Sequence, residues 1–269
     1  MSLKSTLESS DTITYEVYLK GLTESTVRKI SADQKEPDRM LEFRLASFKI
    51  FEETWGLHGD MEINNSTISQ SPQQSPNPQK NLPIPQTNPQ ITSNPPQQYN
   101  FPSRGRDLSK LNLNDIIYYA KPHQDNTGNA TNREDVPEEI KKKFERLGIP
   151  EAERKYLAGA GGQYDSLNVY HKIKEQRAKK GIIFEDLPKA LHTHEAIIKK
   201  HFMKLVPPTD HMFAALHGAV RSGGTFVYIP KGVQLDEPLQ AYFRMNTYAG
   251  GQFEHTLIIV EDDAQATYI

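Results

Sequence analysis

The most regular alternation of hydrophobic and polar positions runs through residues 239–246, which read Leu-Gln-Ala-Tyr-Phe-Arg-Met-Asn. Successive side chains of a β-strand point to opposite faces, so this pattern predicts a strand with one apolar face and one polar face. A second strand is predicted at 252–260, after a glycine-containing bend at 247–251. The two strands and the bend together predict a β-hairpin.

The polar faces of these two predicted strands carry an arginine, an asparagine, two glutamines and a glutamate. Arg244 and Asn246 lie at the end of the first strand, and Glu254 lies near the start of the second. A hairpin would bring these three side chains close together beside its turn. Such a cluster is either a functional site or a polar edge whose groups only satisfy one another.

The chain from residue 225 onward is predicted to consist of short strands separated by turns. These strands are expected at 225–229, 239–246, 252–260 and 264–269. Strands of this length and spacing indicate a barrel, a sandwich or a β-helix. The last strand stops at Ile269 with no turn or cap to cover its edge, which predicts a truncated chain.

Two helices are predicted near the N-terminus, after an arm at residues 1–20 that is expected to be loosely held. The first helix begins after Thr23, a favourable N-cap residue, and ends at Pro37. The second begins at Asp38, and its apolar residues recur at helical spacing. We expect the two helices to form a hairpin packed on a larger body.

A low-complexity segment follows at residues 63–103, where Lys80 is the only charged residue and prolines alternate with Gln, Asn and Ser. Proline removes backbone donors, and the polar residues offer too little apolar area to offset the entropy of ordering. The composition predicts a disordered or polyproline-like insert. A spacer is favoured over a ligand for partner domains.

The next part of the chain, residues 111–221, predicts a mixture of short strands and helices. Strands are expected at 111–120 and 181–184, and helices at 137–147, 150–157, 165–180, 188–205 and 212–220. The run Ala-Gly-Ala-Gly-Gly at 158–162 predicts a helix stop. A phosphate-binding loop would need a preceding strand and a following Lys-Ser or Lys-Thr, and neither is expected there.

Three histidines in this part, His192, His194 and His201, raise the question of a metal site. Only one carboxylate, Glu195, stands near them, and the His-Glu-x-x-His arrangement of metalloproteases is absent. Surface or helix-terminal histidines are the favoured interpretation, and no metal site is predicted.

Composition narrows the function further. The chain has 36% apolar and 25% charged residues and a net charge of −2, which fits a globular protein and gives no electrostatic footprint for nucleic acid. We expect no membrane span and no leader peptide, and therefore a cytoplasmic protein. The absence of cysteine excludes disulfides, thiol nucleophiles and cysteine-bound iron–sulfur clusters within this chain. No Ser/His/Asp or paired-carboxylate signature indicates an enzyme.

Several segments together resemble the SufB family, the scaffold subunit of the Suf iron–sulfur cluster assembly machinery. Two of the longer ones are Leu-Gly-Ile-Pro-Glu-Ala-Glu-Arg-Lys-Tyr-Leu-Ala-Gly at 147–159 and Pro-Leu-Gln-Ala-Tyr-Phe-Arg at 238–244. The others lie at 21–24, 27–31, 36–37, 40–45, 163–166, 213–216, 222–226, 228–233, 251–254 and 256–260. The resemblance covers residues 21–58 and about 111–269, and the low-complexity segment departs from the family pattern.

The resemblance implies an α+β fold in which an N-terminal helical region is followed by the first coils of a right-handed parallel β-helix. The boundaries are then 1–58 for the helical segment, 59–105 for the disordered insert, 106–221 for a mixed helical region and 222–269 for the start of the β-helix.

The resemblance also implies a function in sulfur transfer. SufB-like proteins receive persulfide sulfur from a cysteine desulfurase and its sulfur carrier, and build a transient iron–sulfur cluster together with a SufD-like paralogue and SufC-like ATPase subunits. Arg244 and Asn246 match family positions on the sulfur path, and Glu254 lies in the matching Gly-Gln-Phe-Glu segment. A role confined to satisfying buried polar groups is the competing interpretation of these residues.

This chain departs from the family after Ile269. In the family the equivalent strand runs on into Glu-Gly-Cys, whose thiol accepts sulfur. A split gene, an intein, a frameshift or a deliberately shortened sequence would each explain the break. The sequence therefore predicts a non-enzymatic N-terminal portion of a scaffold. The alternative is a protein-interaction module, or an inactive fragment, that docks partners through its helices and its Pro/Gln-rich insert.

Overall fold

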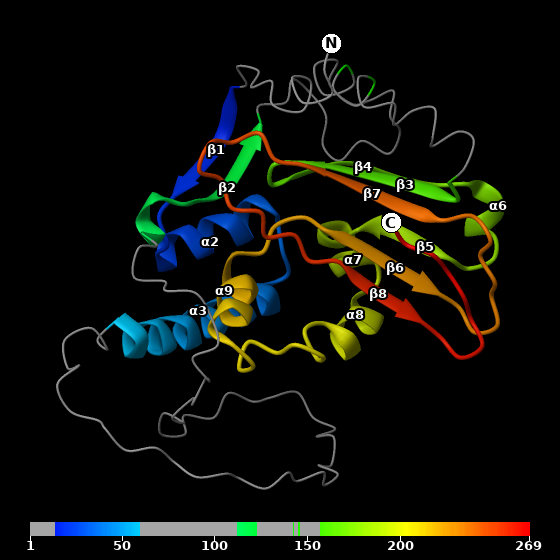
Figure 1. Ribbon diagram of the computed structural model, residues 1–269. Coiled ribbons are helices and arrows are strands. Elements are labelled where there is room, and N and C mark those ends of the chain that lie inside the picture. The colour runs from blue at the N-terminus through cyan, green and yellow to red at the C-terminus, as the bar shows by residue number, and fades with distance from the viewer. Residues whose placement is uncertain (1–13, 60–111, 123–141, 143–144, 146–156) are drawn as a thin grey trace, which may run out of the picture.

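The computed structural model describes residues 14–59, 112–122, 142, 145 and 157–269, which form a mixed α/β arrangement of helices and small sheets (Figure 1). Three sheets of two or three strands are present in this part of the chain, and none of them closes into a barrel. Nearly all of the insert predicted at 59–105 lies outside the described residues, as do the helix predicted at 150–157 and most of that at 137–147.

The first sheet pairs β1 (Tyr15–Lys20) with β2 (Ile117–Pro122) in antiparallel orientation. The prediction of a loose arm over residues 1–20 is therefore wrong for residues 15–20. These residues form a strand in which half-buried and exposed positions alternate regularly, and Val17 and Leu19 pack against the core. The strand predicted at 111–120 begins later, at Ile117, because a short 3-10 turn (Leu113–Asp115) capped by Asn112 precedes it.

The N-terminal helices agree with the prediction. In α2 (Glu24–Asp33) the Thr23 side chain accepts a hydrogen bond from the backbone N–H of Thr26 at 3.1 Å, which caps the helix. Helix α3 (Asp38–Gly59) follows, and both helices pack with α9 (Met212–Val220). Helix α9 has the bounds predicted from the sequence, 212–220. Their shared core is built from buried apolar side chains that include Val27, Ile30, Phe48, Phe51, Ala215, Leu216 and Val220.

An antiparallel hairpin of β3 (Gly159–Tyr164) and β4 (Leu167–Ile173) corrects two predictions. The small-residue run at 158–162, predicted to be a helix stop, lies mostly in strand β3. The segment 165–180, predicted to be a helix, is mostly strand, and only the single turn α6 (Glu175–Ala178) is helical. Close packing explains the glycines: a Cβ at Gly161 would lie 2.6 Å from the His171 ring. Strand β3 is buried on both faces and therefore lacks the alternation of apolar and polar residues that identifies a half-exposed strand.

The third sheet contains β5 (Ile183–Asp186), β6 (Thr225–Ile229) and β8 (Leu257–Val260). Strand β6 coincides with the strand predicted at 225–229, whereas β5 begins and ends two residues later than the strand predicted at 181–184. The helix predicted at 188–205 is two shorter helices, α7 (Leu187–Thr193) and α8 (Glu195–His201), because the backbone leaves the helical region at His194.

Strand β7 (Leu239–Arg244) forms as predicted but pairs in parallel with β3, while β8 pairs in parallel with β6. The predicted hairpin is therefore wrong: β7 and β8 belong to different sheets (Figure 1). The second strand is also shorter than predicted, since residues 252–256 are not in a strand. The last part of the chain pairs with an earlier part at a spacing of 29 to 31 residues, as in Phe226 with Leu257 and Leu239 with Tyr268.

Candidate functional site

Arg244 and Asn246 lie where β7 ends, beside the turn that joins β3 to β4. Arg244 is the last residue of β7 and stands opposite Tyr164 in the parallel register. Its backbone carbonyl accepts a hydrogen bond of 2.7 Å from the N–H of Asp165, so the strand end and the turn are tied together. Both side chains are half-buried.

Asp165 is the centre of this region. Its Oδ1 atom accepts hydrogen bonds from the backbone N–H groups of Asn246, at 2.6 Å, and Thr247, at 3.0 Å. Its Oδ2 atom accepts a hydrogen bond of 3.0 Å from the Tyr15 hydroxyl, which accepts one of 2.9 Å from Thr247 Oγ1. One carboxylate therefore joins the N-terminal strand, the β3–β4 turn and the segment after β7.

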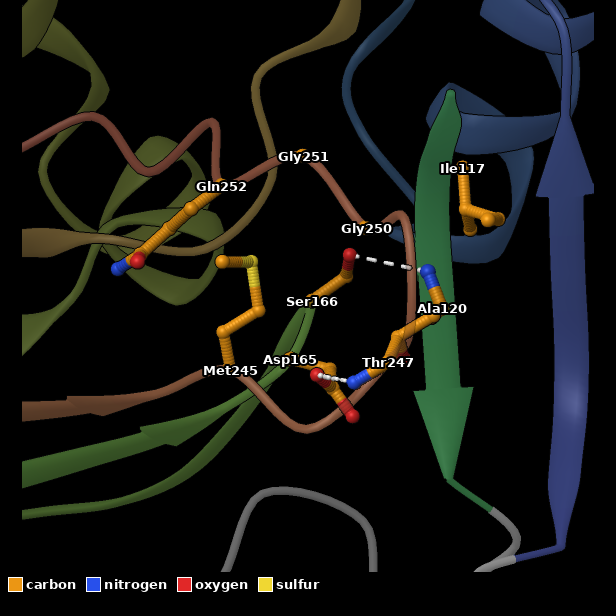
Figure 2. A pocket seen from close by; sticks show the side chains of 9 residues that line it. All are labelled: Ile117, Ala120, Asp165, Ser166, Met245, Thr247, Gly250, Gly251 and Gln252. Atoms are coloured by element: carbon orange, nitrogen blue, oxygen red, sulfur yellow. Dashed lines mark hydrogen bonds between the residues drawn. The ribbon is translucent and has the colours of Figure 1, made fainter. Parts of the chain in front are cut away.

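A small pocket opens beside Asp165, between β2 and residues 245–252, as Figure 2 shows. Its lining consists of Ile117, Ala120, Asp165, Ser166, Met245, Thr247, Gly250, Gly251 and Gln252. The hydroxyl of Ser166 accepts a hydrogen bond from the Ala120 N–H at 3.1 Å, which fixes the wall toward β2. The space inside it is about 10 Å³, room for roughly one water molecule.

Glu254 lies in the segment that leads into β8, two residues after Gln252 of the pocket lining. Its neighbour Phe253 stacks on Tyr118 with ring centroids 5.5 Å apart. Its other neighbour, His255, lies with Nδ1 2.8 Å from Nε2 of His217. The structure thus brings Arg244 and Asn246 together with Asp165, and places Glu254 beside the buried groups described next.

A buried ion cluster of Glu36, Arg44 and Arg221 ties α3 and the α2–α3 turn to the end of α9. Glu36 accepts two hydrogen bonds from Arg44, at 2.6 and 2.8 Å, and one of 2.8 Å from Arg221. All three side chains are fully buried. Burial alone would raise the pKa of Glu36, but the charges of Arg221 and Arg44 outweigh it and hold that pKa at about 2.

The histidine pair next to this cluster is neutral at physiological pH. Burial, together with the nearby charge of Arg221, lowers the pKa of His217 to about 4 and that of His255 to about 3. The guanidinium of Arg221 also lies 4.8 Å from the ring centre of Phe202. The cluster is cationic, because two arginines face one glutamate.

Two of the three histidines considered for a metal site lie close to other groups. His192 Nε2 lies 2.9 Å from the carbonyl oxygen of Lys35, and His194 Nε2 lies 3.6 Å from a carboxylate oxygen of Glu185. Within the described residues, no group of three or more potential ligands is arranged to hold a metal ion.

Sequence reasoning missed Asp165 and Tyr15. Asp165 adopts a positive φ of 49°, and aspartate is one of the few residues that tolerate this conformation in a turn. That signal predicts a turn at most, because nothing local shows which distant amides the carboxylate will bind. Tyr15 lies in the segment that was expected to be loose.

The comparisons with known proteins agree on one family. Residues 128–241 match the family model of the SufBD protein N-terminal region. The chain is 43% identical over 250 residues to an iron–sulfur cluster assembly SufBD family protein of Staphylococcus aureus (strain MRSA252). It is 42% identical over 252 residues to a protein of the same description from Staphylococcus haemolyticus (strain JCSC1435). The chain is therefore similar to SufBD family proteins over 93% of its length.

The alignments cover 93% of this chain and 43% of each of these two relatives. The chain therefore spans less than half the length of the curated proteins it matches. Within the described residues, no helix has both the length and the hydropathy that crossing a bilayer requires.

Proposed function

We propose that this chain is a SufB-like N-terminal portion of an iron–sulfur cluster assembly scaffold, and that it takes part in persulfide sulfur transfer. The observation that carries the proposal is the position of Arg244 and Asn246. The similarity to SufBD family proteins brings sulfur chemistry into consideration, and the two polar residues lie at a strand end that backbone hydrogen bonds hold in place.

A cation near the migrating sulfur favours sulfur transfer. The acceptor thiolate attacks the terminal sulfur of the donor persulfide, the S–S bond of the donor breaks, and its electron pair leaves with the donor thiolate. Oxidation states balance, because one persulfide is replaced by another. A guanidinium stabilises the anionic sulfur atoms throughout, which is the role we assign to Arg244. Asn246 donates from its amide, and Glu254 supports the route.

The acceptor thiol comes from outside the residues of this chain, because the chain contains no cysteine. The iron–sulfur cluster is accordingly cargo that the complete assembly holds for a time. The partners we propose are a SufC-like ATPase, a SufD-like paralogue, and a cysteine desulfurase with its sulfur carrier. The chain acts as a non-catalytic subunit in the cytoplasm.

We further propose that residues 222–269 are the opening coils of a right-handed parallel β-helix. Support comes from the parallel pairing of β6 with β8 and from the bridges Gln234–Gln265 and Leu239–Tyr268. These pairs recur at nearly constant spacing, as stacked coils of one solenoid do. In this arrangement Arg244 and Asn246 stand where sulfur would enter the coil.

A test in cells compares Arg244→Ala with Arg244→Lys, introduced at the native gene. We expect Arg244→Ala to lower the activity of cluster-dependent enzymes and Arg244→Lys to retain part of it, because lysine keeps the charge. Arg28→Ala is the matched control, since among the described residues Arg28 forms only an exposed ion pair with Glu24. Equal enzyme activities in the Arg244→Ala and Arg28→Ala strains, at equal protein levels, would leave Arg244 a structural residue.

A further inference from the structure

The segment that carries Asn246 exposes several of its side chains, and its far end is held by backbone hydrogen bonds of Ile117 with Ala249 and Gly251. Met245 is 47% exposed and Tyr248 is 94% exposed. Ala249 adopts a positive φ of 56°, so the chain turns sharply there. A segment with this exposure keeps one conformation only if specific hydrogen bonds fix it.

Asp165 supplies the hydrogen bonds at the near end of the segment, directly after Arg244. The two N–H groups that its Oδ1 atom accepts belong to consecutive residues, Asn246 and Thr247, so the carboxylate fixes the path of the backbone directly after Arg244. Hydrogen bonds from a backbone N–H to a carboxylate are stronger than those to a neutral oxygen. The N–H of Asp165 meanwhile binds the carbonyl of Arg244, so the same residue holds both sides of the segment.

Asp165 is itself fixed in place. Gln163 donates a hydrogen bond of 2.8 Å from Nε2 to the carbonyl oxygen of Asp165. The Tyr15 hydroxyl occupies the second carboxylate oxygen, and Thr247 closes the ring by donating to that hydroxyl. Tyr15 therefore connects β1, more than 200 residues earlier in the chain, to the segment that follows β7.

We propose that Asp165 is a positioning residue for the sulfur route, acting through Arg244 and Asn246, and that Tyr15 makes the N-terminal strand part of the same site. This inference rests on the proposed function. It assigns Asp165 no contact with sulfur: the carboxylate is occupied by two amides and a hydroxyl, and its negative charge would repel a persulfide anion.

The first experiment measures amide hydrogen exchange of Asn246 and Thr247 in the protein isolated from cells with its partners. Asp165→Ala removes both acceptors, so we expect exchange about 10-fold faster or more, the loss expected for hydrogen bonds to a charged group. Asp165→Asn keeps one acceptor oxygen and should exchange within roughly threefold of the parent. Unchanged exchange in Asp165→Ala would overturn the proposal.

The second experiment measures sulfur transfer to the same isolated protein. Asp165→Ala should slow transfer about as much as Arg244→Ala does, and Asp165→Asn should restore most of the rate. The double variant should be no slower than Arg244→Ala alone, because Asp165 acts through that residue. Additive losses, or no rescue by asparagine, would mean that Asp165 serves stability only and would overturn the proposal.

Tyr15→Phe keeps the test decisive if Asp165→Ala does not fold, since it removes one hydroxyl and leaves the carboxylate. We expect intermediate exchange rates and a smaller loss of transfer. Tyr18→Phe is the matched control, because Tyr18 lies in the same strand and its hydroxyl forms no hydrogen bond within the described residues. Identical behaviour of the two variants would overturn the role of Tyr15.

The outcomes also separate this inference from the function it rests on. If Arg244→Ala and Asn246→Ala transfer sulfur at the parent rate, the proposed function fails, and the positioning role fails with it. If those variants are slow while Asp165→Ala loses amide protection and still transfers normally, the function stands and the positioning role is overturned.

Discussion

The Nη2 atom of Arg221 lies 2.8 Å from Oε1 of Glu36, and neither side chain is exposed to solvent. Arg44 binds the same carboxylate and donates to the carbonyl oxygens of Ala219 and Arg221, which are left without helical partners at the end of α9. Three distant parts of the chain thus meet at one carboxylate, and the helices at the N-terminus are fastened to the segment that leads into β6.

Replacing Glu36 should therefore be costly. Glu36→Ala leaves two buried guanidinium groups without their counter-charge, and removing one partner of a buried ion pair costs roughly 3–5 kcal/mol. Denaturant unfolding of the purified protein measures this loss. Glu24→Ala breaks the exposed pair with Arg28 and should cost about 1 kcal/mol at most. Similar values for the two variants would contradict the importance assigned to the cluster.

Stability should fall in two stages as the pH is lowered. The buried histidines come first: the unfolded chain takes up protons near pH 6.5, whereas folded His217 resists protonation until about pH 4 and folded His255 until about pH 3. Stability conferred by these neutral rings is lost progressively below pH 6.5. Glu36 causes the second stage. Its contribution to the free energy of unfolding is present above its ordinary pKa of 4.5 and is lost as the pH falls toward 2.

The first stage is measured by the denaturant midpoint at several pH values between 7 and 4. Replacing both His217 and His255 with glutamine should flatten the slope between pH 6.5 and 4.5, leaving a contribution from His171, whose pKa burial lowers to about 3. A midpoint that does not change over that interval in the parent protein would contradict this prediction.

Two glycines that share a positive φ should respond differently to substitution. A Cβ at Gly224 would overlap the carbonyl oxygen of His255, whereas one at Gly232 would meet nothing within 4 Å. Gly232→Ala should lower the free energy of unfolding by only about 1–2 kcal/mol, which is the cost of placing a side chain in the left-handed conformation. Gly224→Ala should cost on the order of 4 kcal/mol or more, because the backbone itself must move. Thermal unfolding of both variants checks the difference, and equal costs would contradict the packing at Gly224.

Deletion of residues 63–103 separates the scaffold function from an interaction module. A spacer should be dispensable, so cluster-dependent enzyme activity in cells should stay within about twofold of the parent, since loop length affects stability only weakly. Loss of partner capture in the deleted protein, with the remaining chain still folded, would favour docking through the insert.

The sequence predicts best those elements whose cause is local. Thr23 caps α2 as expected, because a threonine N-cap acts within a single turn. The alternation at 239–246 predicts β7 correctly but not its partner, because period two describes the faces of a strand and contains no information on pairing.

The misses have physical causes as well. The sequence of strand β3 predicts a helix stop because of its glycines. Gly161 is small because β4 packs closely against it, and this tertiary contact cannot be recognised from the local sequence. The candidate site is only half predictable for the same reason. Arg244 and Asn246 follow from the strand pattern and the family resemblance, whereas Asp165 acts across 81 residues on an amide that no local pattern identifies.

The most direct test of the proposed function uses the protein isolated from cells together with its partners through a tag on this chain. Sulfur from labelled cysteine is delivered by a cysteine desulfurase, and the label transferred to the isolated complex is followed with time. We predict that Arg244→Ala slows this transfer about 10-fold or more, as removal of a preorganised charge does, while Arg28→Ala transfers at the parent rate. Equal transfer rates for Arg244→Ala and the parent complex, at equal complex content, would contradict the account.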